Sequence, residues 1–348
     1  MKKTLKNTMA VLVVLSAIAA APAWAAEGRT PVWEPVTIVN SGTYIVTRDI
    51  IVPAGVVINI LSDNVDIDLN GFRLETAGAN PVIAGGGENI TIRNGIVFGG
   101  AAGISLSPAR NVTIEDVKST KSAGAGIELF DATGFALRRN QIIDCTTIGI
   151  AVGAPPLTET SGILEDNQVI RCQEGINIDN ASSTILKLNR VEETTGSFGI
   201  RIGNSFGVLL DRNTVQDALA QGIWVEGSFA CKLHNNLVLR SGGPGIELVA
   251  TVDSLLLDNV VSQSGLDGVV IGGERNHIER NVMNFNGAGG AGWGLLIVAP
   301  DNVYRGNTAR GNAGPPPAAC GGAPATSDVC DSFAASSSLG DNFMPFLL

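Results

Sequence analysis

A hydrophobic–polar pattern that opens on a glycine repeats along most of the chain. An apolar residue follows the glycine, then a residue of any type, then usually a second apolar residue, as in Ile223 and Val225. A second alternating pair comes next, such as Val208 and Leu210, and then an asparagine. The steps between the glycines are 23, 23, 26, 24, 23, 23, 23 and 26 residues, a period that predicts a solenoid. The glycines are Gly103, Gly126, Gly149, Gly175, Gly199, Gly222, Gly245, Gly268 and Gly294.

Each unit of this pattern predicts three short strands, one on each alternating pair and one after the asparagine. Alternation along a strand sends the apolar side chains to one side, here the interior of the solenoid. The 43 glycines and the low charged fraction of 16% suit many short strands joined by tight turns. We therefore expect about ten stacked coils and almost no α-helix beyond the first residues of the chain.

An asparagine column accompanies the glycines. It occupies the same place in ten of eleven units, and Val117 takes that place in a unit that is one residue shorter. Equivalent residues of stacked parallel strands lie about 4.8 Å apart, and Asn side chains at that spacing hydrogen-bond into ladders. Asn also tolerates the left-handed backbone of tight turns. A structural role is therefore predicted for Asn70, Asn94, Asn140, Asn167, Asn189, Asn213, Asn236, Asn259, Asn281 and Asn307.

The Gly-Ile-x-Ile and x-x-Asn-x-Val steps resemble those of right-handed parallel β-helix repeat proteins, the pectate-lyase-like group that includes polygalacturonases and alginate epimerases. The resemblance covers about residues 58 to 310. It implies an all-β, right-handed, single-stranded parallel β-helix, a handedness that also follows from the rule for parallel crossovers. It further implies that carbohydrate is bound or processed outside the first strand of each coil.

The first 25 residues predict a secretory signal peptide. Lys2, Lys3 and Lys6 precede an apolar run from Met9 to Ala20, and a small-residue cleavage pattern ends at Ala25. The run is shorter than the roughly 20 residues that a membrane anchor needs. We therefore expect an exported protein, periplasmic or secreted, with no membrane insertion after cleavage.

Four segments follow from the pattern. Residues 1–25 are the signal peptide, 26–57 are a lead-in with capping strands, 58–310 are the β-helix, and 311–348 are a tail that caps the last coil. Two units of 26 residues carry insertions, Gly153 to Thr160 and Gly287 to Trp293. Insertions in solenoids become loops, either on a binding face or as tolerated surface bulges.

Charge narrows the range of partners. The formal net charge of −10 becomes −13 when the three signal-peptide lysines are removed. Nucleic acid is disfavoured because phosphate backbones bind clusters of Lys and Arg, and none is present. Direct binding of polyanionic sugars also needs a bridging cation, for which calcium stays open as a cofactor.

The candidate site lies on the outward positions of the first strands in the middle coils. Glu226 and Glu247 are the predicted acid–base pair, with Arg201 as a third catalytic residue, because paired carboxylates flank bonds in sugar chemistry. Glu128 lies five coils from Glu247, roughly 24 Å at the usual strand spacing and too far to cooperate. The alternative is a solvated strand face with neutralising cross-strand contacts. The predicted binding residues are Trp224, which offers an apolar face to a sugar ring, together with Asn177 and Asp179.

Several enzyme signatures are missing. The chain has neither the aspartate cluster of polygalacturonases nor the Asp-Pro-His-Asp segment of alginate epimerases. His234 and His277 fall on the second strand, and no His/Cys spacing typical of a metal site occurs. The resemblance also extends to helper proteins that mature periplasmic copper enzymes. The function stays open between a polysaccharide lyase, hydrolase or epimerase and a non-catalytic scaffold or accessory protein of the cell envelope.

The five cysteines predict two disulfides. Cys145 and Cys172 each lie five residues after a ladder asparagine, so they should stack within disulfide range, which export permits. The alternative for this pair is two stacked free thiols. Cys320 and Cys330 form the second predicted pair, and Cys231 is left as a buried free thiol.

Overall fold

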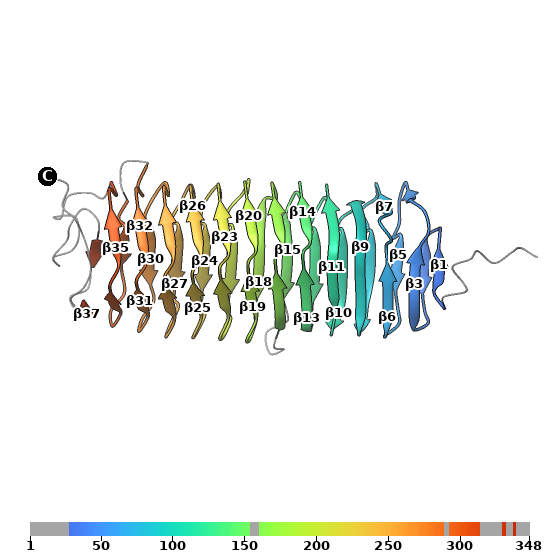
Figure 1. Ribbon diagram of the computed structural model, residues 1–348, viewed down its shortest axis with the longest axis horizontal. Helices are drawn as coiled ribbons and strands as arrows, with labels where there is room; N and C mark the ends of the chain where they lie inside the picture. The colour runs from blue at the N-terminus through green and yellow to red at the C-terminus, as the bar shows by residue number, and fades with distance from the viewer. Residues whose placement is uncertain (1–27, 154–159, 289–291, 314–328, 332–336, 339–348) are drawn as a thin grey trace, which may run out of the picture.

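The computed structural model describes residues 28–153, 160–288, 292–313, 329–331 and 337–338. Over these ranges the chain winds into a long parallel β-helix of about 12 turns (Figure 1), which confirms the predicted all-β solenoid. All of the paired strands are parallel, and each pairs with its equivalent one coil further on, as β21 does with β24 and β24 with β27. The described ranges contain no helix, and therefore none that would span a membrane.

Three columns of strands run along the axis. The first-strand column is β2 (Val36–Ile38), β5 (Ile58–Ile60), β8 (Ile83–Glu88), β10 (Ile104–Arg110), β12 (Ile127–Phe130), β15 (Ile148–Gly153), β18 (Glu174–Asp179), β21 (Ile200–Gly203), β24 (Ile223–Glu226), β27 (Ile246–Val249), β30 (Val269–Gly272), β33 (Leu295–Ile297) and β36 (Val329–Asp331).

The second-strand column is β1 (Thr30–Val32), β3 (Gly42–Val46), β6 (Val65–Asp68), β13 (Ala132–Arg138), β16 (Ser161–Glu165), β19 (Ile185–Lys187), β22 (Leu209–Asp211), β25 (Lys232–His234), β28 (Leu255–Leu257), β31 (His277–Glu279), β34 (Val303–Arg305) and β37 (Ser337–Ser338). Two longer strands, β9 (Ile90–Gly99) and β11 (Thr113–Thr120), run through both the second and the third positions of their coils.

The third-strand column is β4 (Ile50–Val52), β7 (Arg73–Thr76), β14 (Gln141–Ile143), β17 (Gln168–Ile170), β20 (Arg190–Glu192), β23 (Thr214–Gln216), β26 (Leu237–Leu239), β29 (Val260–Ser262), β32 (Val282–Asn284) and β35 (Thr308–Arg310).

The turn count exceeds the expected ten because stacking begins before residue 58. Strand β1 pairs with β3, β2 with β5 and β4 with β7, all in parallel. The lead-in strands therefore continue the same columns rather than crossing the end of the array. The inward residues of the first strands, such as Ile200, Ile223 and Ile246, are fully buried and stand in register. Columns of this kind form one continuous apolar core from end to end.

The predicted asparagine ladder is confirmed from Asn140 to Asn307. Each side-chain amide in this run donates to the next side chain, as Asn213 Nδ2 does to Asn236 Oδ1 at 3.0 Å. It also donates to a second-strand carbonyl, as Asn213 does to Leu186 O at 2.9 Å. These asparagines are at most 1% exposed, so the ladder satisfies backbone and side-chain groups that water cannot reach.

The register corrects two details of the predicted column. Gly95, not Asn94, is paired with Val117. In that coil the buried column therefore passes through the residue after Asn94, and Asn94 itself is not part of the column. The left-handed backbone also lies beside the ladder and not in it, because Asn70, Asn94 and the residues just before the ladder asparagines carry the positive φ angles. Asn is common in both positions, which is why the sequence alone merged them.

Candidate functional site

The first-strand face brings the six predicted site residues together. Asn177 pairs in register with Arg201, Arg201 with Trp224, and Trp224 with Glu247. One step along the strands, Asp179 pairs with Gly203 and Gly203 with Glu226. Alternation directs all six side chains outward, so they form one surface across four neighbouring coils. We call this set the central patch.

Arg201 is the hub of the central patch. Its Nε donates to Glu226 Oε1 at 2.9 Å, its Nη1 donates to Asn177 Oδ1 at 2.9 Å, and its Nη2 also contacts Glu226. The Arg201 side chain is only 16% exposed, so water screens this ion pair poorly. These contacts fix the Arg201 guanidinium in place between Glu226 and Asn177.

Trp224 lies against this hub. The guanidinium carbon of Arg201 is 5.5 Å from the centre of the indole, a cation–π contact, and the Phe198 ring lies 6.2 Å away at 54°. The side chain is partly exposed, but its Nε1 is buried without a hydrogen-bond partner in the described part of the chain. A buried indole N–H normally finds a partner, so this atom is unusual within the patch.

Glu247 has a carboxyl neighbour that sequence reasoning missed. Gln221 Nε2 donates to Glu247 Oε2 at 2.9 Å from one side. On the following coil, Asp267 accepts a hydrogen bond of 2.6 Å from the backbone N–H of Trp293. Burial raises the pKa of Asp267, and the charge of Glu247 raises it further. Asp267 directly precedes the repeat glycine Gly268, and comparing the residues before each glycine would have found it.

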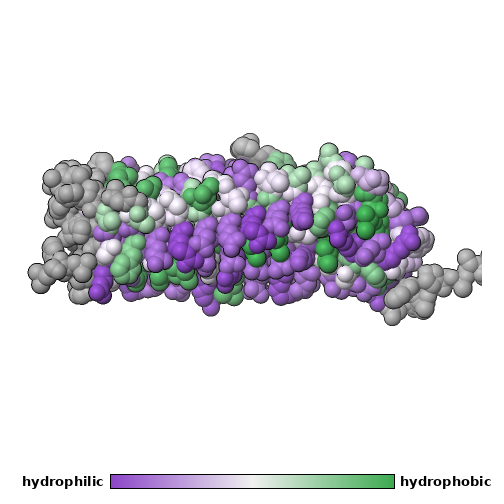
Figure 2. All heavy atoms as spheres, turned by 90° about the horizontal axis from the view of Figure 1, so that it is seen from above, coloured by the Kyte–Doolittle hydropathy of each residue, from purple (hydrophilic) through white to green (hydrophobic). Residues whose placement is uncertain are grey.

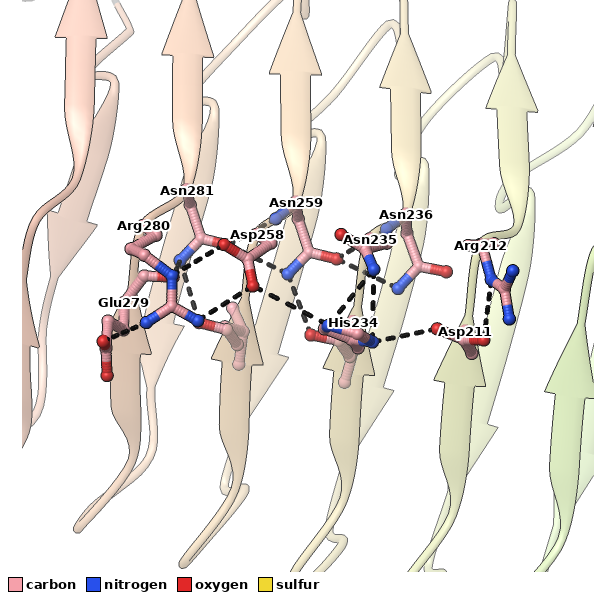
Figure 3. A network of polar contacts seen from close by, with 12 residues as sticks. Asp211, Arg212, His234, Asn235, Asn236, Asp258, Asn259, Glu279, Arg280 and Asn281 are labelled. Atoms are coloured by element: carbon pink, nitrogen blue, oxygen red, sulfur yellow. Dashed lines mark hydrogen bonds and ion pairs between the residues drawn. The ribbon is translucent and has the colours of Figure 1, made fainter.

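The second-strand face is occupied by a ladder of ion pairs (Figure 3). His234 Nδ1 lies 2.9 Å from Asp211 Oδ1, and its Nε2 lies 3.7 Å from Asp258. Asp258 in turn accepts two hydrogen bonds from Arg280, at 2.8 and 2.9 Å. His277 contacts Glu279 on the same column at 3.3 Å. As predicted, both histidines lie on second strands, away from the central patch.

The cysteines differ from the prediction in one pair. Cys145 and Cys172 are stacked on neighbouring coils, but both are free thiols, so the predicted disulfide between them is absent from the structure. A hydrogen bond with Cys172, followed by burial, raises the pKa of the Cys145 thiol. Cys231 is free as predicted, and burial raises its pKa to about 11. Cys330 is disulfide-bonded, while its predicted partner Cys320 lies outside the described residues.

Parts of three further predicted features also lie outside the described residues. These are the signal peptide within residues 1–27, residues 154–159 and 289–291 of the two insertions, and most of the tail.

Comparison with known proteins identifies the family. The model of the family described as "Periplasmic copper-binding protein (NosD)" matches residues 39–205 and 157–312. The two matches together span most of the chain, which therefore belongs to this right-handed β-helix family. The family is periplasmic, which confirms the predicted export. Among curated proteins, no relative matches the chain.

Solved structures share the fold at low identity. The A-module of mannuronan C-5 epimerase AlgE6 from Azotobacter vinelandii has a TM-score of 0.66 at 14% identity, covering 88% of this chain and 92% of that one. The A-module of AlgE4 from the same organism gives 0.57 at 14% identity, with 93% of each chain covered. The catalytic unit of the GH87 alpha-1,3-glucanase from Streptomyces thermodiastaticus gives 0.53 at 13%, covering 91% and 62%.

The family description implies a bound copper ion, but the described residues do not form a suitable copper site. They contain no group of three or more His, Cys, Asp or Glu side chains able to hold a metal ion. His234 and His277 are both engaged with carboxylates of the charge ladder. Cys145 and Cys172 offer soft sulfur ligands, but their side chains are 3% and 0% exposed inside the core.

Proposed function

We propose that this periplasmic β-helix protein binds carbohydrate on the outward face of its first strands, with Trp224 at the centre of the binding surface. The observation that carries the proposal is the arrangement around that side chain. Arg201 and Glu247 flank Trp224 in register, and Arg201 is held in place by Glu226 and Asn177. An aromatic face among fixed hydrogen-bonding groups is the combination that sugar rings require, with apolar C–H faces and polar edges.

The solved neighbours give this proposal its ligand classes. They are mannuronan epimerases and an alpha-1,3-glucanase, which act on an acidic and a neutral polysaccharide respectively. The central patch carries three carboxylates and one arginine, which disfavours direct contact with an acidic chain. A neutral glycan is therefore the preferred ligand, and an acidic one would bind only with a bridging cation such as calcium.

We further propose that Glu226 and Glu247 perform acid–base catalysis on the bound sugar. Glu226 is bound to Arg201 and suits the role of a base, while Glu247 lies beside Asp267, whose pKa is raised. Two carboxyl groups that flank a glycosidic bond serve as the acid and the base, or as the nucleophile, in most sugar-processing enzymes. Replacing Glu226 or Glu247 by Gln should then abolish turnover while binding persists, unchanged for Glu247→Gln and weakened by only about fivefold for Glu226→Gln, which also loses the Arg201 contact.

The test is a binding and cleavage screen of the mature protein. The probes are alpha-1,3-glucan oligosaccharides and mannuronan oligosaccharides, each with and without calcium chloride. Binding of the glucan without calcium is the expected result, and appearance of shorter or epimerised products would add catalysis. Failure of every probe to bind in either condition would contradict the proposal.

Family membership favours a second candidate, an accessory protein that serves another periplasmic protein without acting on sugar. The same screen separates the two, because an accessory role predicts no glycan binding at the central patch. A pull-down from periplasmic extract that depends on Trp224 and resists added glycan would favour this second function.

A further inference from the structure

A hollow lies on the first-strand face, on the N-terminal side of Trp224. Strand β15 presents the small outward residues Ala151 and Gly153 there, and the half-buried Ile148 at its start also lines the hollow. In register on one side is β12, with Glu128 beside Ala151 and Phe130 beside Gly153. On the other side is β18, where Asn177 and Asp179 take the same two places. The small residues between two rows of larger ones leave a cavity of about 230 Å³.

The walls of this hollow carry an aromatic ring and several unused polar atoms. Phe130 is 48% exposed at the rim, so its ring offers an aromatic face to a ligand in the hollow. Glu128 accepts one hydrogen bond from Ser105 Oγ at 3.0 Å, through Oε2. Asp179 likewise accepts one bond, from Asn204 Nδ2 at 3.2 Å through Oδ1. Each carboxylate therefore keeps a second oxygen without a partner in the described part of the chain.

Asn177 supplies the complementary group. Its Oδ1 is taken by Arg201, so its side-chain N–H₂ remains the available donor at the edge of the hollow. Among the described residues that line the hollow, none is Lys or Arg. A ligand here meets an aromatic face, two carboxylate acceptors and one amide donor, which suits the hydroxyl groups of a neutral sugar ring and repels an acidic one.

We propose that this hollow is a second sugar-binding subsite, which holds a neutral sugar ring of the same glycan chain that contacts Trp224. The inference rests on the proposed function and names its substrate class. Ala151 and Trp224 are three coils apart, through Asn177 and Arg201. That separation is roughly 14 Å at the usual strand spacing, which requires a chain of several sugar units running along the axis of the β-helix.

Two variants test the subsite by opposite means. Phe130→Ala removes the aromatic rim, and Ala151→Leu fills the hollow from its floor. Both side chains point outward, so both proteins should fold with an unchanged melting temperature. Each should lower the affinity for a long alpha-1,3-glucan oligosaccharide by about tenfold. Phe285→Ala is the matched control, because Phe285 is 57% exposed and lies outside the first-strand column.

The outcomes separate this inference from the proposed function. If Trp224→Ala weakens glucan binding while Phe130→Ala and Ala151→Leu leave it unchanged, the hollow is not a subsite and the proposed function stands. If mannuronan oligosaccharides of equal length bind more tightly than the glucan without calcium, the assignment to a neutral ring is wrong. If neither glycan binds the wild-type protein in either condition, the proposed function and this inference both fail.

Discussion

The first-strand and second-strand faces of this β-helix are built on the same coils, but the polar side chains on the two faces have different partners. On the second-strand face, acidic and basic side chains contact each other from coil to coil, as Asp211, His234, Asp258 and Arg280 do (Figure 3). On the first-strand face, the side chains surround the exposed Phe130 ring, a hollow and the buried Trp224 indole N–H, which has no hydrogen-bond partner among the described residues. Ion pairs that satisfy each other need no ligand, whereas groups arranged around open space have unused capacity for one.

Hydrophilic and hydrophobic residues are unevenly distributed on the surface of the β-helix. On the face shown in Figure 2, hydrophilic residues form a band along much of the long axis, and hydrophobic residues gather toward both ends. Exposed aromatic rings, such as Phe130, Phe206 and Phe229, are few enough to mark particular places on the molecule.

The largest expected effect is a loss of stability when the buried asparagine ladder is disrupted. Asn236→Leu leaves the Leu210 carbonyl, the Asn213 backbone N–H and the Asn213 side chain without their partner. Each buried polar group left unpaired costs about 1–3 kcal/mol, so the free energy of unfolding should fall by about 3 kcal/mol or more. Chemical denaturation measures this. Asn235→Gly is the control, since Asn235 is exposed with a positive φ of 56° and should change stability by about 0.5 kcal/mol at most. Equal losses in both variants would contradict a ladder role.

The coils, the asparagine ladder and the central patch could largely be predicted from the sequence. Repeat glycines and alternating apolar pairs specified the coils, because a period-2 pattern can bury only one side of each strand. The same repeat register predicted that Arg201, Trp224 and Glu247 lie side by side in the central patch, because they hold equivalent positions in successive units.

What the sequence did not predict depends on side-chain size and direction across coils. The hollow needs Ala151 and Gly153 to be compared with the larger residues on both neighbouring strands. The capture of Arg201 by Glu226 depends on which of several nearby carboxylates its long side chain reaches. Asp267 was missed because it belongs to the turn before the strand, outside the positions where ligands were expected.

A smaller effect is expected inside the central patch. Glu226→Gln removes the charge that holds the Arg201 guanidinium against Trp224. Loss of one charge-assisted contact should lower glycan affinity by about 1 kcal/mol, roughly fivefold, measured by isothermal titration calorimetry. Glu193→Gln is the control, because Glu193 is exposed and follows a third strand. An unchanged affinity in Glu226→Gln would mean that Arg201 does not depend on this partner.

The smallest effect belongs to the second-strand face. Hydrogen bonds from Arg280 hold the pKa of Asp258 below its usual value. A depressed folded-state pKa stabilises the fold above the unfolded value of about 4, and this contribution is lost as the pH falls through the folded value. Arg280→Met should therefore lower the melting temperature slightly at neutral pH, and the difference from wild type should shrink on acidification. A difference that grows toward acidic pH would contradict this pairing.

The most direct test of the contrast between the faces is one calorimetric comparison, in which Trp224→Ala and His234→Ala are titrated with the glycan that the wild-type protein binds best. Burying most of the Trp224 ring against a sugar contributes about 1–3 kcal/mol, so Trp224→Ala should weaken binding by roughly tenfold to a hundredfold. His234→Ala should bind like the wild type, because the partners of His234 are other protein side chains. Unchanged affinity in Trp224→Ala, or an equal loss in His234→Ala, would contradict a carbohydrate site on the first-strand face.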